Sequence, residues 1–329
     1  MKTLVATTLL LLACHRPAEI ASGGDGYSAE ARDALVGRRA PHVALEMLDG
    51  EHVALADLLG RKPVYLKFWA TWCEPCREQM PHLEAAHRTY GDRVAIFAID
   101  LGLNDAIETV RAFRTERGLT VPIAIDGDGV LGEQFHVSVT PQHVLIDRAG
   151  IVRYVGHGAT PELDRALAAL ADGGPGSSDA PARPVPGEGA LSLTLADGST
   201  FTIAGQAGHP VALAFVTTWC DDYLAKTRPA MSEACIAHAH QVEALRKAHD
   251  GIVWVTIAHP VWTAADDLDE YRKRLGVGTP IGRDDGAAWF AHYRVRDVPT
   301  TILLDRRGAE VARVGDRGDE LARALARLD

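Results

Sequence analysis

The residues best suited to chemistry are two cysteines, Cys73 and Cys76, which Glu74 and Pro75 separate. Two thiols at this spacing can close into a disulfide and reopen, which suits electron exchange with the cysteines of a partner. A zinc site is a weaker interpretation, because no second CxxC and no spaced Cys/His pair completes a tetrahedral set of ligands. An inert structural disulfide is the remaining alternative. The spacing therefore predicts a redox-active pair.

The flanking residues predict how this pair is positioned. An apolar run over residues 64–72 indicates a buried strand that ends at Cys73. Residues at helical spacing follow the motif, namely Met80, Leu83, His87 and Tyr90. Free amides and the dipole at a helix N-terminus lower the pKa of a thiol below its usual ~8.5. We therefore expect Cys73 to be an accessible nucleophile and Cys76, one turn deeper, to resolve the mixed disulfide.

Length and charge narrow the class of protein. A chain of 329 residues corresponds to about two domains of ~150 residues each. Its hydrophobic content of 47% is ordinary for globular domains. A net charge of −10 without a basic stripe argues against nucleic-acid binding.

The first residues predict export. Residues 1–14 hold one cation, Lys2, and an apolar stretch that is too short to span a bilayer, which indicates a signal peptide. The sequence Leu11-Leu12-Ala13-Cys14 resembles a bacterial lipobox, in which the cysteine becomes the lipidated first residue; a plain secretory signal is the alternative. We expect an exported lipoprotein, anchored in a membrane and facing the periplasm or the cell exterior, with a polar tether over residues 15–39. An oxidising compartment also favours disulfides between the remaining cysteines.

Two segments of the chain repeat each other on either side of a Gly-, Pro- and Ser-rich linker at residues 172–190. Each has an Asp-Gly hairpin signal, at residues 49–50 and 197–198, and an apolar strand ending in Thr-Trp-Cys, at residues 71–73 and 218–220. Each later has a proline, Pro141 or Pro299, before an apolar strand and an Asp-Arg-x-Gly turn. Alternating strands and helices predict one α/β domain at residues 40–171 and another at residues 191–329.

The first copy resembles the thioredoxin superfamily, specifically the membrane-attached TlpA-like and ResA-like thiol–disulfide oxidoreductases. The resemblance covers about residues 40–170. It is carried by Phe68-Trp69-Ala70-Thr71-Trp72-Cys73-Glu74-Pro75-Cys76-Arg77, Met80-Pro81, residues 126–129 and Thr140-Pro141. It implies two tandem thioredoxin-like domains, each a central mixed β-sheet flanked by helices, with no CxxC in the second.

The resemblance also implies roles for residues around the motif. Pro141 corresponds to the family's cis-proline, and the backbone of Thr140 would pair with an extended substrate chain. Trp72 would shape the substrate surface or simply pack at the end of the strand. Pro299 is the counterpart of Pro141, and Pro81 would kink the helix after the motif.

Three residues would tune the thiols. Thioredoxins carry a buried aspartate where this chain has Lys67, whose ammonium would favour a thiolate or extend to solvent. Glu74 opposes a thiolate charge and mildly favours a reducing couple, while Pro75 costs no hydrogen bond in the first turn and stiffens the loop. ResA-like proteins carry a glutamate where this chain has Gln79, with Glu78 beside it.

The second copy keeps one cysteine of the motif. Cys220 aligns with Cys73, but Tyr223 takes the place of Cys76, so CxxC exchange is excluded there. We expect a structural disulfide between Cys220 and Cys235; a redox-active pair is the alternative. Cys235, His238 and His240 are poorly spaced for one helical face, so we predict no metal site.

These observations favour a thiol–disulfide oxidoreductase that acts on exported proteins, in the reducing direction that the family implies. It would need no cofactor. Its partners would be proteins with cysteine thiols or disulfides, an upstream thiol protein that donates electrons, and the membrane that holds its lipid. Some family members reduce apocytochrome c, but no residue here names that substrate.

Three alternatives stay open. A peroxiredoxin-like peroxidase needs a cysteine framed by proline and threonine, a frame that Thr71-Trp72-Cys73 lacks. A copper-delivery module uses CxxxC with a distant histidine; His136 and His143 flank the proline region, but the spacing of the cysteines differs. A protein-binding scaffold that merely retains the motif is the third.

Overall fold

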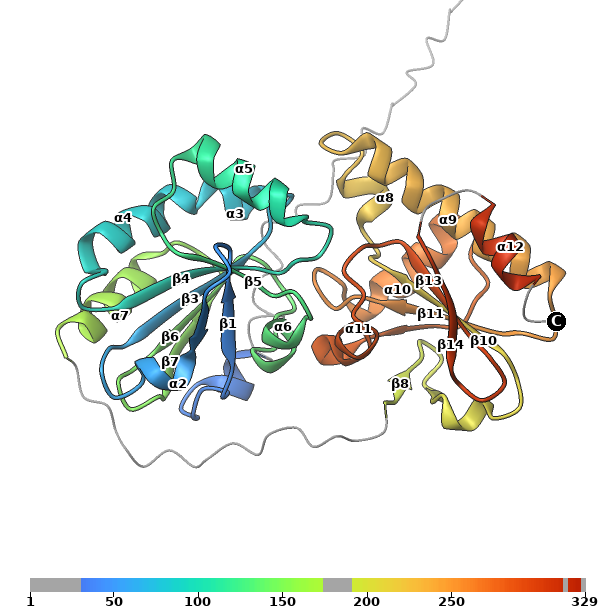
Figure 1. The fold of residues 1–329 in the computed structure, drawn as a ribbon, viewed down its shortest axis with the longest axis horizontal. Coiled ribbons are helices and arrows are strands. Elements are labelled where there is room, and N and C mark those ends of the chain that lie inside the picture. The colour runs from blue at the N-terminus through green and yellow to red at the C-terminus, as the bar shows by residue number, and fades with distance from the viewer. Residues whose placement is uncertain (1–30, 174–190, 316–318, 327–329) are drawn as a thin grey trace, which may run out of the picture.

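Two β-sheets, each covered by helices, lie side by side in the computed structural model, which describes residues 31–173, 191–315 and 319–326 (Figure 1). The sheets share no strand among these residues. The predicted signal peptide, the lipidated Cys14 and most of the linker lie outside the described residues.

The first sheet has seven strands in the order β2-β1-β5-β4-β3-β6-β7. They are β1 (Ala44–Met47), β2 (His52–Ala54), β3 (Val64–Trp69), β4 (Ala95–Asp100), β5 (Ile123–Ile125), β6 (Gln142–Ile146) and β7 (Val152–Gly156). β3, β4 and β5 are parallel, whereas β6 pairs antiparallel with β3. Because β3 is central and covered on both faces, all six of its residues are buried.

Helices cover this sheet and carry the CxxC motif. They are α2 (Leu55–Leu58), α3 (Glu74–Glu78), α4 (Met80–Tyr90), α5 (Ile107–Arg117), α6 (Val130–Gln134) and α7 (Pro161–Ala171). In Figure 1, α3 to α5 lie along one side of the sheet, and α6 lies toward the second domain.

The prediction that Pro81 kinks one long helix is wrong. The chain instead breaks at Gln79, which ends α3 and precedes α4. Pro81 then lies in the first turn of α4, where a missing N–H costs no hydrogen bond.

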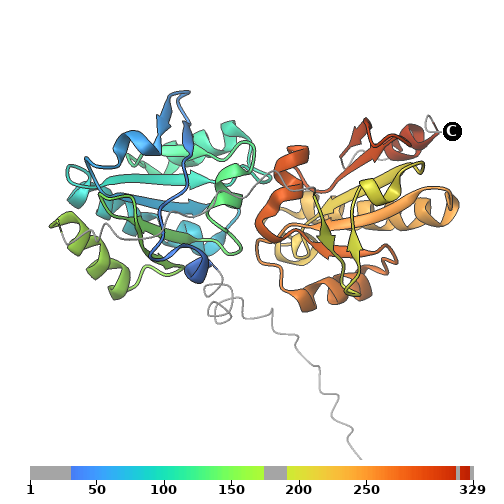
Figure 2. The same cartoon turned by 90° about the horizontal axis from the view of Figure 1, so that it is seen from below.

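The second sheet has five strands in the order β12-β11-β10-β13-β14, with a separate hairpin, β8-β9. The hairpin strands are β8 (Leu193–Thr194) and β9 (Thr200–Phe201). The sheet strands are β10 (Val211–Val216), β11 (Val253–Ala258), β12 (Ile281–Arg283), β13 (Thr300–Leu304) and β14 (Glu310–Val314). The helices are η1 (Ala204–Gln206), α8 (Cys220–Tyr223), α9 (Pro229–Ala248), α10 (Ala265–Leu275), η2 (Asp285–Ala287), α11 (Ala288–Tyr293) and α12 (Glu320–Leu325). Figure 2 shows the two sheets with their helices from below.

The second sheet repeats the order of the first. β10 is central and fully buried, pairs parallel with β11 and pairs antiparallel with β13, as β3 does with β4 and β6. The Thr140–Pro141 and Val298–Pro299 peptide bonds are both cis. The predicted class, two tandem thioredoxin-like domains with mixed sheets, is confirmed.

The tether predicted for residues 15–39 is wrong in its last nine residues. Residues 31–35 are helical, and Ala31 and Leu35 are fully buried. The backbones of Gly37 and Arg38 then hydrogen-bond with Val152 in β7. The polar composition concealed two apolar side chains four residues apart, which form one buried helical face.

Within the described ranges, no helix combines the length and the apolar character that crossing a bilayer requires.

Candidate active site

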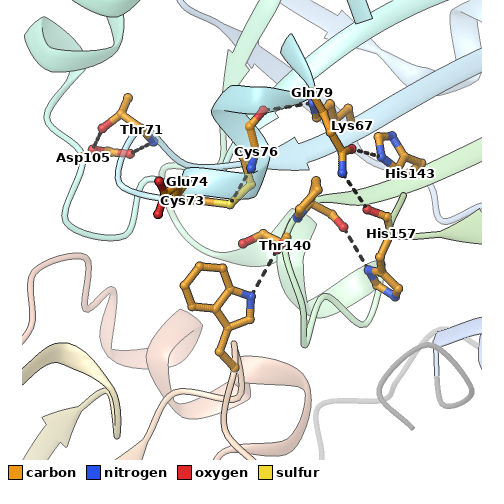
Figure 3. Close-up of a disulfide and its surroundings, with 12 residues drawn as sticks. Lys67, Thr71, Cys73, Glu74, Cys76, Gln79, Asp105, Thr140, His143 and His157 are labelled. Carbon is orange, nitrogen blue, oxygen red and sulfur yellow. Dashed lines mark hydrogen bonds between the residues drawn. A yellow bond between two sulfur atoms is a disulfide. The ribbon is translucent and has the colours of Figure 1, made fainter. Parts of the chain in front are cut away.

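Strand β3 and a short turn bring Cys73 to the start of α3. Cys73 is the N-cap residue of this helix, and its Sγ accepts a hydrogen bond from the Cys76 backbone N–H at 3.1 Å. A donor aimed at the sulfur stabilises negative charge on it in the reduced state. Cys73 and Cys76 are joined by a disulfide, with sulfur atoms 1.98 Å apart (Figure 3). Pro75 lies in the first turn, as its chemistry favours.

Lys67 lies behind the motif and does not extend to solvent. Its side chain is fully buried, and Nζ donates a hydrogen bond to the Cys76 carbonyl at 3.2 Å. Burial lowers the pKa of Lys67 to about 7, because desolvation disfavours the ammonium. The interpretation of Lys67 as a snorkelling surface residue is therefore wrong.

A chain of neutral hydrogen bonds connects the core to the cis-proline. Tyr65 Oη lies 2.8 Å from His143 Nδ1, and His143 Nε2 lies 2.9 Å from Gln79 Oε1. Gln79 Nε2 donates to the His157 carbonyl at 3.2 Å, and His157 Nδ1 lies 2.9 Å from the Pro141 carbonyl. A carbonyl can only accept, so His157 must donate to Pro141.

The same logic fixes the tautomer of His143. Burial, and secondarily the charge of Lys67, holds the pKa of His143 well below its usual value, so the ring is neutral. Gln79 Oε1 must accept from Nε2–H, which leaves Nδ1 to accept from the Tyr65 hydroxyl. Gln79 thus takes part in packing and hydrogen bonding at the place where a glutamate was expected from the family.

Asp105 is a site residue that the sequence analysis missed. Its Oδ2 accepts from the Thr71 N–H at 2.6 Å, and its Oδ1 accepts from the Thr71 hydroxyl, which fixes the turn before Cys73. Arg228 of the second domain lies 3.2 Å from the same carboxylate. Burial raises the pKa of Asp105, and the contacts with Thr71 and Arg228 oppose that rise. No local pattern around Asp105 distinguishes it from the other acids of the chain.

The prediction that Cys73 is accessible is wrong for this arrangement of the domains. Cys73 and Cys76 are both 0% exposed, and the substrate-binding candidates Trp72, Thr140 and Pro141 are buried as well. Residues of the second domain contact this face directly. The Glu74 N–H donates to Tyr223 Oη at 3.0 Å, and Trp262 Nε1–H donates to the Thr140 carbonyl at 3.1 Å.

Comparison with known proteins decides the family. Residues 36–155 match the AhpC/TSA family. The thioredoxin-like protein YneN of Bacillus subtilis is 37% identical over 134 residues, which are 40% of this chain and 78% of that protein. The thiol-disulfide oxidoreductase ResA of Bacillus anthracis is 36% identical over 129 residues, which are 39% of this chain and 72% of that protein. The chain belongs to the ResA-like thiol–disulfide oxidoreductases.

One solved structure similar to this ResA-like chain is that of a putative protein disulfide isomerase from Bacteroides thetaiotaomicron. It is 29% identical, and the match covers 42% of this chain and 90% of that one with a TM-score of 0.38.

The second domain of this ResA-like chain contains its own disulfide. Cys220 begins α8 and is joined to Cys235 in α9, with sulfur atoms 1.89 Å apart. Tyr223 lies where a second motif cysteine would be. His238 is buried, and its Nε2 lies 2.8 Å from Thr301 Oγ1. Desolvation lowers the pKa of His238 to about 4. No metal-holding group of three His, Cys, Asp or Glu side chains occurs in the described part of the chain.

The Cys220–Cys235 disulfide is expected to stabilise the ResA-like chain without carrying electrons. Replacing both cysteines by serine should lower the free energy of unfolding of the second domain by about 3 kcal/mol, the chain-entropy value for a loop of about 15 residues. Guanidinium unfolding and an insulin-reduction assay check the two halves of this prediction. A folded double variant whose insulin reduction drops more than tenfold would place this disulfide in the electron path.

Proposed function

We propose that this protein reduces disulfides in exported proteins while a lipid on Cys14 holds it at a bacterial membrane, facing the periplasm or the cell exterior. Its partners are cysteine-containing proteins and an upstream thiol protein that returns electrons to it. The observation that carries this proposal is the Cys73–Cys76 pair at the start of a helix in a ResA-like domain.

The proposed reaction needs only the two thiols. The Cys73 thiolate attacks one sulfur of a substrate disulfide, forms a mixed disulfide and releases the other sulfur as a thiolate, which takes up a proton. The Cys76 thiol then loses its proton and attacks Cys73 Sγ. This step releases the second substrate thiol and forms the Cys73–Cys76 disulfide. The substrate gains two electrons, and a donor dithiol must supply two electrons to restore the enzyme.

The charges near the motif bear on the direction. The exposed carboxylate of Glu74 destabilises a thiolate beside it, which supports a reducing couple because it disfavours the reduced, thiolate form. An ammonium on Lys67 acts in the opposite sense, but its pKa of about 7 leaves it partly neutral at neutral pH. Glu74 thus supports the reducing direction that the family resemblance implies, and Lys67 opposes it only in its protonated form.

The copper-delivery alternative loses support at His143. Both ring nitrogens of this buried histidine are engaged, by Tyr65 and by Gln79, so neither is free to bind copper. The peroxidase alternative needs a cysteine framed by proline and threonine, but the neighbours of Cys73 in the chain are Trp72 and Glu74.

An insulin-reduction assay with dithiothreitol tests the proposed function. The wild-type protein should accelerate precipitation of the insulin B chain, and Cys73→Ser should reduce the rate to background because no nucleophile remains. The matched control is the double variant Cys220→Ser/Cys235→Ser, which keeps the CxxC pair and should retain the activity. Consumption of hydrogen peroxide without insulin reduction would instead favour the peroxidase.

A further inference from the structure

The second domain occupies the face on which a substrate would bind. We propose that it is a built-in cap, which takes the substrate's place beside Pro141, so that a protein substrate reaches Cys73 only after the two domains separate. This inference rests on the proposed function of Cys73, but the access that it describes can be measured without that function.

The cap uses the backbone groups that strand addition would use. The Trp262 N–H donates to the Ser138 carbonyl at 2.8 Å, and its Nε1–H donates to the Thr140 carbonyl at 3.1 Å. These carbonyls belong to the segment that leads into Pro141. An extended substrate chain would need the same acceptors to pair with this edge. Substrate and Trp262 therefore compete for one edge.

An aromatic cluster closes the space beside the disulfide. Trp72, next to Cys73, contacts Trp219 at 4.7 Å and Trp262 at 5.3 Å between ring centroids. Tyr223, which takes the place of the missing cysteine, contacts Trp262 at 4.9 Å. The main hydrophobic cluster runs through these rings from one domain into the other. Burial of this apolar surface favours the closed arrangement.

The docking is reciprocal. Asn104 follows β4 as Trp262 follows β11, and both have left-handed backbone φ angles, +54° and +56°. The Asn104 N–H donates to the Arg296 carbonyl at 2.8 Å, as the Trp262 N–H donates to Ser138. Asn104 Oδ1 also accepts from the Val298 N–H, next to the second cis-proline, at 2.8 Å. Each domain thus fills the cis-proline edge of the other, which argues for a specific interface and against accidental contact.

Arg228 of the second domain makes polar contacts with the first domain next to the Cys73 turn. Its guanidinium donates to the Thr71 hydroxyl at 2.7 Å and to the Asn104 carbonyl at 3.0 Å, and it pairs with Asp105. Asp105 is fully buried at its side chain, whereas the Arg228 side chain is 24% exposed. Removing the Arg228 guanidinium would leave the buried Asp105 carboxylate without a compensating positive charge, which strongly weakens the closed state.

The interface can separate without unfolding either domain. No β-ladder joins the two sheets within the described residues, so opening breaks no strand pairing. It breaks the hydrogen bonds of Trp262 and Asn104, the Arg228–Asp105 ion pair, the aromatic cluster and the packing of α6 against η2 and α11. The rate at which a reagent reaches Cys73 is then set by the fraction of open molecules.

Alkylation of Cys73 measures that fraction. The reduced full-length protein is treated with iodoacetamide, and labelling of the Cys73 peptide is followed by mass spectrometry. Trp262→Ala should increase the labelling rate about tenfold, a change that corresponds to ~1.4 kcal/mol. Trp262→Phe keeps a ring but loses the Nε1–H donor, so a smaller increase is expected. Arg228→Ala, which leaves the aromatic cluster intact, should also accelerate labelling.

The control is Arg323→Ala, because α12 lies at the end of the second domain away from the first (Figure 1). Unchanged labelling in folded Trp262→Ala and Arg228→Ala, or equal acceleration in Arg323→Ala, would overturn the cap. Faster labelling without any insulin reduction would keep the cap and reject the proposed oxidoreductase. If the wild type reduces insulin but neither interface variant changes the labelling rate, the proposed oxidoreductase is kept and the cap is rejected.

Discussion

Cys76→Ser should convert the protein into a trap that stays covalently joined to its substrates. Cys73 can still attack a substrate disulfide, but no second thiol is present one turn deeper to resolve the mixed disulfide. Turnover in the insulin assay should fall by roughly a thousandfold or more, as it does when a member of a covalent catalytic unit is removed. Non-reducing electrophoresis and mass spectrometry of the variant expressed with its signal peptide should identify proteins disulfide-bonded to Cys73.

The trap has two informative companions. Cys73→Ser/Cys76→Ser should capture nothing, because it lacks the attacking sulfur. Adding Trp262→Ala to Cys76→Ser should increase the captured amount if the cap limits access. A Cys76→Ser protein that captures no partner, while its Cys73 reacts with iodoacetamide, would count against an exchange enzyme.

Much of the fold could be predicted because turns and apolar strands are specified by a few neighbouring residues, and because the second half of the chain repeats them. The Asp-Gly turns, the apolar strands β3 and β10, and the prolines before β6 and β13 each specify an element within a few residues, although β3 ends at Trp69 and not at Cys73 as predicted. The position of Cys73 at a helix N-terminus follows from the same pattern.

The rest depended on contacts between residues distant in sequence. Trp262 and Arg228 meet the first domain 122 and 157 residues away along the chain, at Thr140 and Thr71, and no periodicity encodes such pairs. These contacts place the second domain over the face that holds the buried Cys73, so the sequence alone predicted an accessible Cys73. One signal was present: the repeat aligns Trp72 with Trp219, which places a large ring beside each cysteine.

The burial of Lys67 could not be predicted from the sequence. A lysine in an apolar strand is expected to extend to water, but Lys67 lies on β3, which is central in the sheet, and α3 covers it. Its ammonium donates to a neutral carbonyl, Cys76 O, and within the described residues no carboxylate pairs with it. Desolvation therefore destabilises the charged form, which lowers the pKa from its usual 10.5 to about 7.

Lys67→Met should stabilise the protein most strongly at low pH. Below pH 7 the lysine is protonated in both the folded and the unfolded chain, so the folded state bears the full cost of a buried charge, ~5 kcal/mol at most from the lowered pKa. Between pH 7 and 10.5 only the unfolded chain holds the proton, so wild-type stability gains from this group as the pH rises. Allowing for the lost hydrogen bond, the variant should gain about 3–4 kcal/mol at pH 6 and much less at pH 9.

Guanidinium unfolding of the wild type and the variant at both pH values gives this difference in the free energy of unfolding. The other titrating groups are the same in both proteins, so their contributions cancel in the difference. Lys62→Met, at a partly exposed lysine just before β3, is the matched control for removing a positive charge from the same region. If Lys67→Met instead destabilises the protein equally at pH 6 and pH 9, the ammonium is not in a desolvated site. Its bond to the Cys76 carbonyl would then outweigh the cost of burying the charge, and Lys67 would act as a structural support for the helix that holds both sulfurs.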